Sequence, residues 1–128
     1  MRIVSNLLTV LFLTISAVSF SQENIDYLLL NKEYDKALQQ IEQQIGNQTK
    51  EELYFKKGLI FNQMQKYRKA IDAFSSAKKM SPENSEILEE LADAHSLLGN
   101  YYDARGNYEK AVGPDSTNLQ LLGKLGRN

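Results

Sequence analysis

Apolar residues recur every three or four positions through most of the chain, and this spacing predicts a series of amphipathic helices. Two runs, 51–64 and 67–80, show the spacing well. Small residues lie between the large ones in these runs, and they predict close contact between two helix backbones. The small residues are Gly58, Ala70 and Ala77, and the large ones beside them are Phe61, Tyr67 and Phe74. The pattern therefore indicates an all-α protein built from packed helix pairs.

Polar and helix-breaking residues mark where these helices are expected to begin and end. Thr49-x-x-Glu52 and Thr117-x-x-Gln120 have the spacing of a capping box, which opens a helix. Gly46, Ser81-Pro82 and Gly113-Pro114 are predicted helix ends.

The apolar pattern also matches itself at a fixed step along the chain. Eight positions keep their size class across this step, whereas the residues between them vary. The pairs are Tyr54 and Leu88, Gly58 and Ala92, Phe61 and His95, Met64 and Leu98, Tyr67 and Tyr101, Ala70 and Ala104, Phe74 and Tyr108, and Ala77 and Ala111. Such a period is typical of a stacked helical repeat, in which each unit buries its apolar face against its neighbours.

The order of these residues, together with Pro82, resembles the tetratricopeptide repeat. The resemblance implies an α-solenoid of about three helix-turn-helix repeats, at about 22–50, 51–84 and 85–118. The second repeat fits almost throughout, whereas the third departs from the pattern where Gly113-Pro114 comes early. The first repeat is marked by Tyr34, Ala37 and Ile41, and Gln44 replaces its last small residue.

A partial repeat, 119–128, is expected to form one further helix. Leu119, Leu122 and Leu125 have the spacing of an apolar face. We expect Leu122 and Leu125 to pack near Tyr108, with Leu119 and Leu121 partly exposed. This half-covered end predicts either self-association through it or a natural chain that continues beyond residue 128.

The N-terminal segment, 1–21, has the features of a secretory signal peptide. Arg2 is its only charge, Ile3 to Val18 are mostly apolar, and Ser19 and Ser21 are small residues at the positions that a signal peptidase reads. We therefore expect cleavage before Gln22 and a periplasmic or secreted domain of tetratricopeptide repeats at 22–128. An uncleaved membrane anchor is the alternative.

Composition narrows the function further. The absence of Cys excludes disulfides and thiolate metal sites. The net charge of −1 does not favour nucleic-acid binding. The charge is nevertheless uneven: residues 51–84 have seven basic and four acidic side chains, and residues 85–118 have two and seven. These blocks are either a dipole that steers a partner or solvated surfaces.

No group of residues has the spacing of a catalytic, metal or cofactor site, so we expect a non-catalytic protein without a cofactor. His95 is the only histidine, and we interpret it as a packed, hydrogen-bonded ring. Glu89, Glu90 and Asp93 form a carboxylate cluster, but the loop spacing of an EF-hand is missing.

The resemblance implies function in a concave groove lined by the first helix of each repeat. The peptide-clamping members use basic residues and Asn at positions occupied here by Gln22, Asp26, Glu86 and Glu90, so binding of an acidic C-terminal tail is not expected. We predict a groove that is apolar at one end and acidic at the other, and that suits an extended segment with a basic and an apolar side chain. Its residues are Glu52, Phe55, Leu59, Asn62, Gln63, Glu86, Glu89, Asp93 and Ser96.

The sequence thus favours a secreted or periplasmic protein-interaction scaffold. The alternative is the N-terminal fragment of a longer secreted or membrane-anchored repeat protein, such as a sensor.

Overall fold

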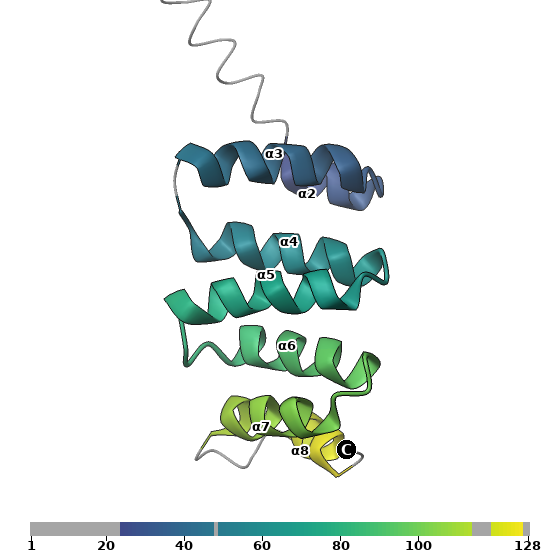
Figure 1. The fold of residues 1–128 in the computed structure, drawn as a ribbon, viewed down its shortest axis with the longest axis vertical. Helices are drawn as coiled ribbons and strands as arrows, with labels where there is room; N and C mark the ends of the chain where they lie inside the picture. The colour runs from purple at the N-terminus through teal and green to yellow at the C-terminus, as the bar shows by residue number, and fades with distance from the viewer. Residues whose placement is uncertain (1–23, 48, 114–118, 127–128) are drawn as a thin grey trace, which may run out of the picture. The chain divides into compact units, whose positions relative to one another are not determined.

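The computed structural model describes residues 24–47, 49–113 and 119–126. The expected signal peptide, 1–21, lies outside them. The described residues form seven helices and no strand (Figure 1). The helices are α2 (Ile25–Leu30), α3 (Tyr34–Asn47), α4 (Glu51–Gln63), α5 (Tyr67–Met80), α6 (Ser85–Leu97), α7 (Tyr101–Val112) and α8 (Leu119–Leu125).

The chain divides into two compact units, Met1–Ala37 and Leu38–Asn128, and the boundary lies within α3. In the first unit, Asn24 caps α2, because its side-chain oxygen accepts a hydrogen bond from the amide of Asp26 at 3.2 Å. Ile25 and Leu28 are the buried residues of this helix.

In the second unit, α4, α5, α6 and α7 follow one another in chain order, and α8 lies against α7 (Figure 1). From α4 to α7, consecutive helices are joined by short turns, so each contacts the next one along the chain.

The period of the sequence is repeated in the backbone. Lys32, Gln65 and Gly99 have positive φ angles of 59°, 58° and 85°, and each stands in the turn inside one repeat. After each of them, the next amide donates to a carbonyl five residues earlier, at 2.8 Å in all three turns. A left-handed residue at this place is a common way to end a helix, and glycine adopts it without strain. Only the third of these turns uses glycine.

Two apolar clusters hold the second unit together. The first, the Phe74 cluster, consists of Ala70, Phe74, Leu91 and Ala94, with Phe55, Leu59, Phe61 and Ile71 packed against it. The second, the Tyr108 cluster, consists of Ala92, Ala104, Tyr108 and Leu121, with Ala111, Val112 and Leu125 packed against it. Each cluster joins three successive helices.

Some predicted helix boundaries are wrong by a residue or two. Helix α4 begins at Glu51 after Lys50, which makes no side-chain cap, so Thr49 does not cap it. Helix α3 ends at Asn47, so Gly46 lies inside its last turn. The predicted ends of α5 and α7 are confirmed, since Ser81 and Gly113 follow their last residues. Thr117 lies outside the described residues.

The face by which α8 packs also differs from the prediction. Leu121 is only 2% exposed and belongs to the Tyr108 cluster, whereas Leu122 is 36% exposed. One period earlier, Ile87 and Leu88 are both buried. Leu122 corresponds to Leu88 of α6, and α6 is followed by α7. No described helix follows α8, so Leu122 has no following helix to cover it. Leu121 is buried because it packs on the preceding pair, α6 and α7.

Candidate functional site

The predicted groove residues of α4 divide into a packed pair and a polar set. Phe55 and Leu59 are half-buried and pack against the Phe74 cluster, and the rings of Phe55 and Phe74 lie 5.7 Å apart. Glu52 and Gln63 are exposed. Asn62 is half-buried, and its side-chain oxygen has no hydrogen-bond partner. The α4 residues of the predicted groove therefore offer a small apolar surface together with polar side chains.

The predicted acidic residues of α6 come together around a basic residue from another helix. Nζ of Lys124, on α8, donates to Oε1 of Glu89 at 2.7 Å. It also donates to Oδ2 of Asp93 at 2.7 Å and to Oδ1 at 3.1 Å. All three side chains are 25–32% exposed. Thus Glu89 and Asp93 bind an ammonium group that comes from the same chain, and their predicted role toward a basic partner stays a prediction.

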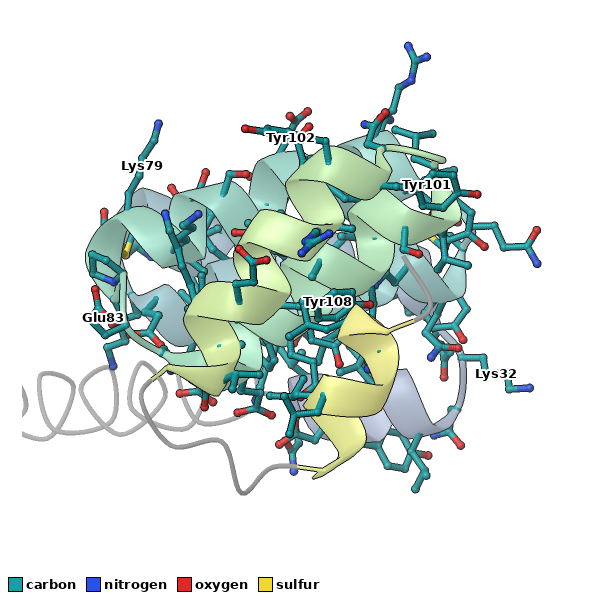
Figure 2. The ribbon with its side chains drawn as sticks, turned by 90° about the horizontal axis from the view of Figure 1, so that it is seen from below. Lys32, Lys79, Glu83, Tyr101, Tyr102 and Tyr108 are labelled. Carbon is teal, nitrogen blue, oxygen red and sulfur yellow. The ribbon has the colours of Figure 1, made fainter. Side chains whose placement is uncertain are left out.

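Tyr108 completes this arrangement from α7. Its hydroxyl donates to Oδ1 of Asp93, and its ring centroid lies 5.7 Å from Nζ of Lys124. Figure 2 shows Tyr108 beside α8, and Tyr101 and Tyr102 away from that helix. An ammonium group over a tyrosine ring and against two carboxylates has both ion pairing and cation–π attraction. We call Glu89, Asp93, Tyr108 and Lys124 the ammonium site.

The electrostatics of the site follow from this crowding. Burial raises the pKa of Glu90, and the charges of Asp93, Glu89 and Glu86 raise it further, while Lys124 lowers it. Burial opposes the charge of Lys124, but its hydrogen bonds to Asp93 and Glu89 outweigh this and raise its pKa. Burial and the hydrogen bond to Asp93 raise the pKa of the Tyr108 hydroxyl, so Tyr108 stays a proton donor. The ammonium group of Lys124 thus attracts Glu89, Asp93 and Glu90. For Glu90, burial and the neighbouring carboxylates outweigh this attraction, so its charged form is disfavoured.

The remaining predicted residues of α6 lie outside the ammonium site. Glu86 is exposed in the first turn of the helix, where Asn84 caps it by accepting from the amides of Glu86 and Ile87. Ser96 is half-buried near the other end.

His95, near the end of α6, lies beside residues of α5 and α7 and away from the ammonium site. Its ring is largely buried, as predicted, but Nδ1 has no hydrogen-bond partner and lies 4.0 Å from Oδ2 of Asp103. Burial lowers the pKa of the ring, Asp103 opposes this, and Lys78 adds to it. The predicted hydrogen bond is therefore missing at Nδ1, because Asp103 is too distant to accept one.

Within the part of the chain that the structure describes, no group of three or more His, Cys, Asp or Glu side chains is arranged to hold a metal ion. Among helices α2 to α8, none combines the length and hydropathy needed to cross a membrane.

Sequence reasoning missed Lys124 and Tyr108 as parts of the ammonium site. One signal was available for Lys124, because it follows Glu90 by one full period of the repeat. Glu90 and Lys124 hold equivalent positions in the first helices of successive repeats and have opposite charges. Helix α8 could therefore have been expected to place a cation near the carboxylates of α6.

Comparison with known proteins identifies the repeat. The family model described as tetratricopeptide repeat matches residues 51–84. Residues 51–84 are thus similar to the tetratricopeptide repeat (TPR), and the chain has the TPR fold. The predicted all-α solenoid of TPR units with a partial fourth helix is therefore confirmed.

Three solved TPR domains illustrate this likeness. The first TPR domain of Spaghetti (RPAP3), bound to the HSP90 peptide SRMEEVD, is 14% identical, with a TM-score of 0.76 over 84% of this chain and 86% of that one. The second TPR domain of human RPAP3, in complex with the HSP70 peptide SGPTIEEVD, is 17% identical, with a TM-score of 0.74 over 84% and 90%. The Sgt2 TPR domain from Aspergillus fumigatus is 17% identical, with a TM-score of 0.72 over 85% and 74%. No curated protein matches the chain.

Proposed function

We propose that this TPR protein is a non-catalytic scaffold that binds a protein segment carrying a lysine or arginine together with an apolar side chain. The observation that carries the proposal is the ammonium site, where Glu89 and Asp93 hold the amino group of Lys124 at 2.7 Å. The apolar surface of Phe55 and Leu59, on α4, would receive the apolar side chain.

The solved neighbours support peptide binding as the general role, because two of them were solved with peptides bound. Both of those peptides end in Glu-Glu-Val-Asp and are acidic there. Here the charges of Asp93, Glu89 and Glu86 all raise the pKa of Glu90, which lies on the same helix. Like charges across an interface disfavour a partner, so we infer that this chain selects the opposite charge.

Fluorescence anisotropy with two labelled peptides tests this selectivity. One probe is a short peptide that alternates leucine and lysine, and the other is SRMEEVD. We expect the wild-type chain to bind the basic probe saturably and more tightly at low salt, and to leave the acidic probe unbound. Tight binding of SRMEEVD, or absence of saturable binding by the basic probe, would contradict the proposal.

Charge removal locates the binding surface. The double variant Glu89→Gln/Asp93→Asn should bind the basic probe at least about tenfold more weakly, because the two carboxylates no longer attract a cation. Glu109→Gln is the matched control, since Glu109 is an exposed residue of α7 that pairs with Arg105. Equal losses in both variants would show that only overall charge matters.

We further propose that the protein is exported to the periplasm or the medium, and that the mature chain begins at Gln22. Support comes from Arg2, the apolar run that follows it and the small residues Ser19 and Ser21. Intact mass of the protein recovered from each fraction tests this, and a species that retains Met1–Ser21 would support an anchor instead.

A second candidate is that the chain is the N-terminal part of a longer secreted or membrane-anchored TPR protein, such as a sensor. The exposure of Leu122, whose counterpart Leu88 is buried, favours this candidate. A reading frame that continues past Asn128 with a further amphipathic helix would establish it.

A further inference from the structure

The ammonium site is built by the last complete repeat and filled by a different element. Glu89 and Asp93 come from α6 and Tyr108 comes from α7, whereas Lys124 belongs to α8. Three of the four groups therefore belong to helices other than α8. What α8 contributes is a ligand.

The same face of α8 also carries the apolar contacts. Leu121 precedes Lys124 by three positions and is buried against Ala92, Ala104 and Tyr108. Leu125 packs against the same cluster. Residues three and four apart lie on one side of a helix, so the face reads Leu-x-x-Lys-Leu. Figure 2 shows α8 beside α7, near Tyr108.

Helix α8 depends on this docking. It has seven residues and contains Gly123, and an isolated helix shorter than about 12 residues is marginal in water. Elements with few buried contacts open more readily than the rest of a protein. Detaching α8 would uncover Ala92, Ala104 and Tyr108 beside two carboxylates.

We propose that α6 and α7 form a receptor for a partner helix with a Leu-x-x-Lys-Leu face, and that α8 is a built-in occupant which the partner displaces. This inference rests on the proposed function and specifies it: the partner segment is helical at this end of the groove, and access is regulated by α8. Because α8 is tethered, it competes at a high effective concentration and lowers the apparent affinity for any partner.

A peptide with the sequence of residues 117–128, TNLQLLGKLGRN, is the probe. Its labelled form is titrated with the full chain and with the full-chain variant Leu121→Ser/Lys124→Ser, in which α8 loses its buried leucine and its ion pairs. We call this double variant the detached variant. We expect it to bind the peptide at least about tenfold more tightly than the wild type, because the occupant has been removed.

Three controls define the contact. Leu122→Ser changes an exposed residue of α8 and should bind the peptide as the wild type does. A peptide in which Lys124→Ala is introduced should bind neither protein. Adding Asp93→Asn to the detached variant should abolish its gain.

A second measurement does not depend on the detached variant. Hydrogen exchange of the wild-type chain is followed with and without saturating unlabelled peptide, and amides of α8 should exchange faster with peptide, while those of α6 stay protected. Unchanged exchange in α8, together with equal affinity of wild type and detached variant, would overturn displacement. If both bind the basic probe equally well, the proposed scaffold function stands without this regulation.

Sedimentation of the wild-type chain at increasing concentration identifies one specific partner. A dimer that dissociates when the peptide is added would show that α8 of a second copy occupies the receptor. This result would support the proposal that α6 and α7 form a receptor for such a helix. A dimer that the peptide leaves intact, with no peptide bound, would contradict it.

Discussion

Phe74 and Tyr108 hold the same position in successive repeats, yet the junctions around them have opposite character. Around Phe74, the α4 residues Phe55 and Leu59 are packed on the apolar cluster. Around Tyr108, the residues at the same repeat positions are Glu89 and Asp93, and Asp93 accepts a hydrogen bond from the Tyr108 hydroxyl.

The exchange is therefore concerted. Where the aromatic residue is Phe, its neighbour 15 positions earlier is Leu59, and where it is Tyr, that neighbour is Asp93. The first helix of the next repeat matches this character in each case. Helix α6 contributes the apolar Leu91 to the Phe74 cluster, and α8 contributes the basic Lys124 to the ammonium site. A repeat can thus keep its shape while one junction is apolar and the next holds a charged side chain.

The largest expected effect comes from emptying the apolar junction. Phe74 is fully buried, so Phe74→Ala should lower the free energy of unfolding by about 3–5 kcal/mol. Leu121→Ala should cost the rest of the domain much less, because α8 can detach while α4 to α7 remain packed. Chemical denaturation measures both, and equal losses would show that α8 is as integral as α5.

A smaller effect is expected at Gly58, where α4 meets the Phe74 ring of α5. A Cβ on Gly58 would lie 2.4 Å from two carbon atoms of the Phe74 ring. Gly58→Ala should therefore destabilise by about 1–3 kcal/mol through overpacking. Gly106→Ala is the control, since a Cβ there meets nothing within 4 Å, and it should stabilise α7 by about 0.5–1 kcal/mol. Similar changes in both thermal midpoints would contradict this packing.

Exchanging the two aromatic residues tests their specialisation. Phe74→Tyr would bury a hydroxyl opposite Leu59, at a cost of about 1–3 kcal/mol. Tyr108→Phe removes the donor to Asp93 and should cost about 0.5–1.5 kcal/mol. Adding Leu59→Asp to Phe74→Tyr should recover part of the loss, and strict additivity of the two changes would show that the pairs are independent.

The fold was predictable because the repeat period and the small residues depend on local spacing, which a sequence displays directly. The groove itself remains a prediction: the structure shows Glu89 and Asp93 paired with Lys124 of the same chain, and this contact is separate from the binding of a partner. The position of Lys124 in the ammonium site was not predictable, because spacing alone does not show which side of α8 packs against α6 and α7. Leu121 and Leu122 are adjacent, and only the packing against α6 and α7 decides which one is buried and hence where Lys124 points.

The smallest effect concerns Glu90, whose pKa is affected by Asp93 and Glu89 on α6 and by Lys124 on α8. Burial, followed by Asp93, Glu89 and Glu86, raises its pKa in the folded chain. A carboxyl group with a raised pKa stabilises the fold below its unfolded pKa, and this contribution is lost as pH rises through the folded value. Ionised Glu90 is thus unfavourable at neutral pH. Glu90→Gln should stabilise by less than about 1 kcal/mol at pH 7, since the group is half-exposed.

The advantage of Glu90→Gln should disappear once the pH falls below the ordinary pKa of a Glu carboxyl, about 4.3, because Glu90 is then protonated in both the folded and the unfolded chain. Thermal unfolding across this pH range measures it, with Glu83→Gln as the control, because Glu83 is exposed where α5 meets α6 (Figure 2). Lys124 lowers the pKa of Glu90. In a Lys124→Ala background the gain from Glu90→Gln should therefore be larger, and it should be greatest at low salt, where screening is weakest. A gain that is independent of pH and of Lys124 would separate Glu90 from the ammonium site.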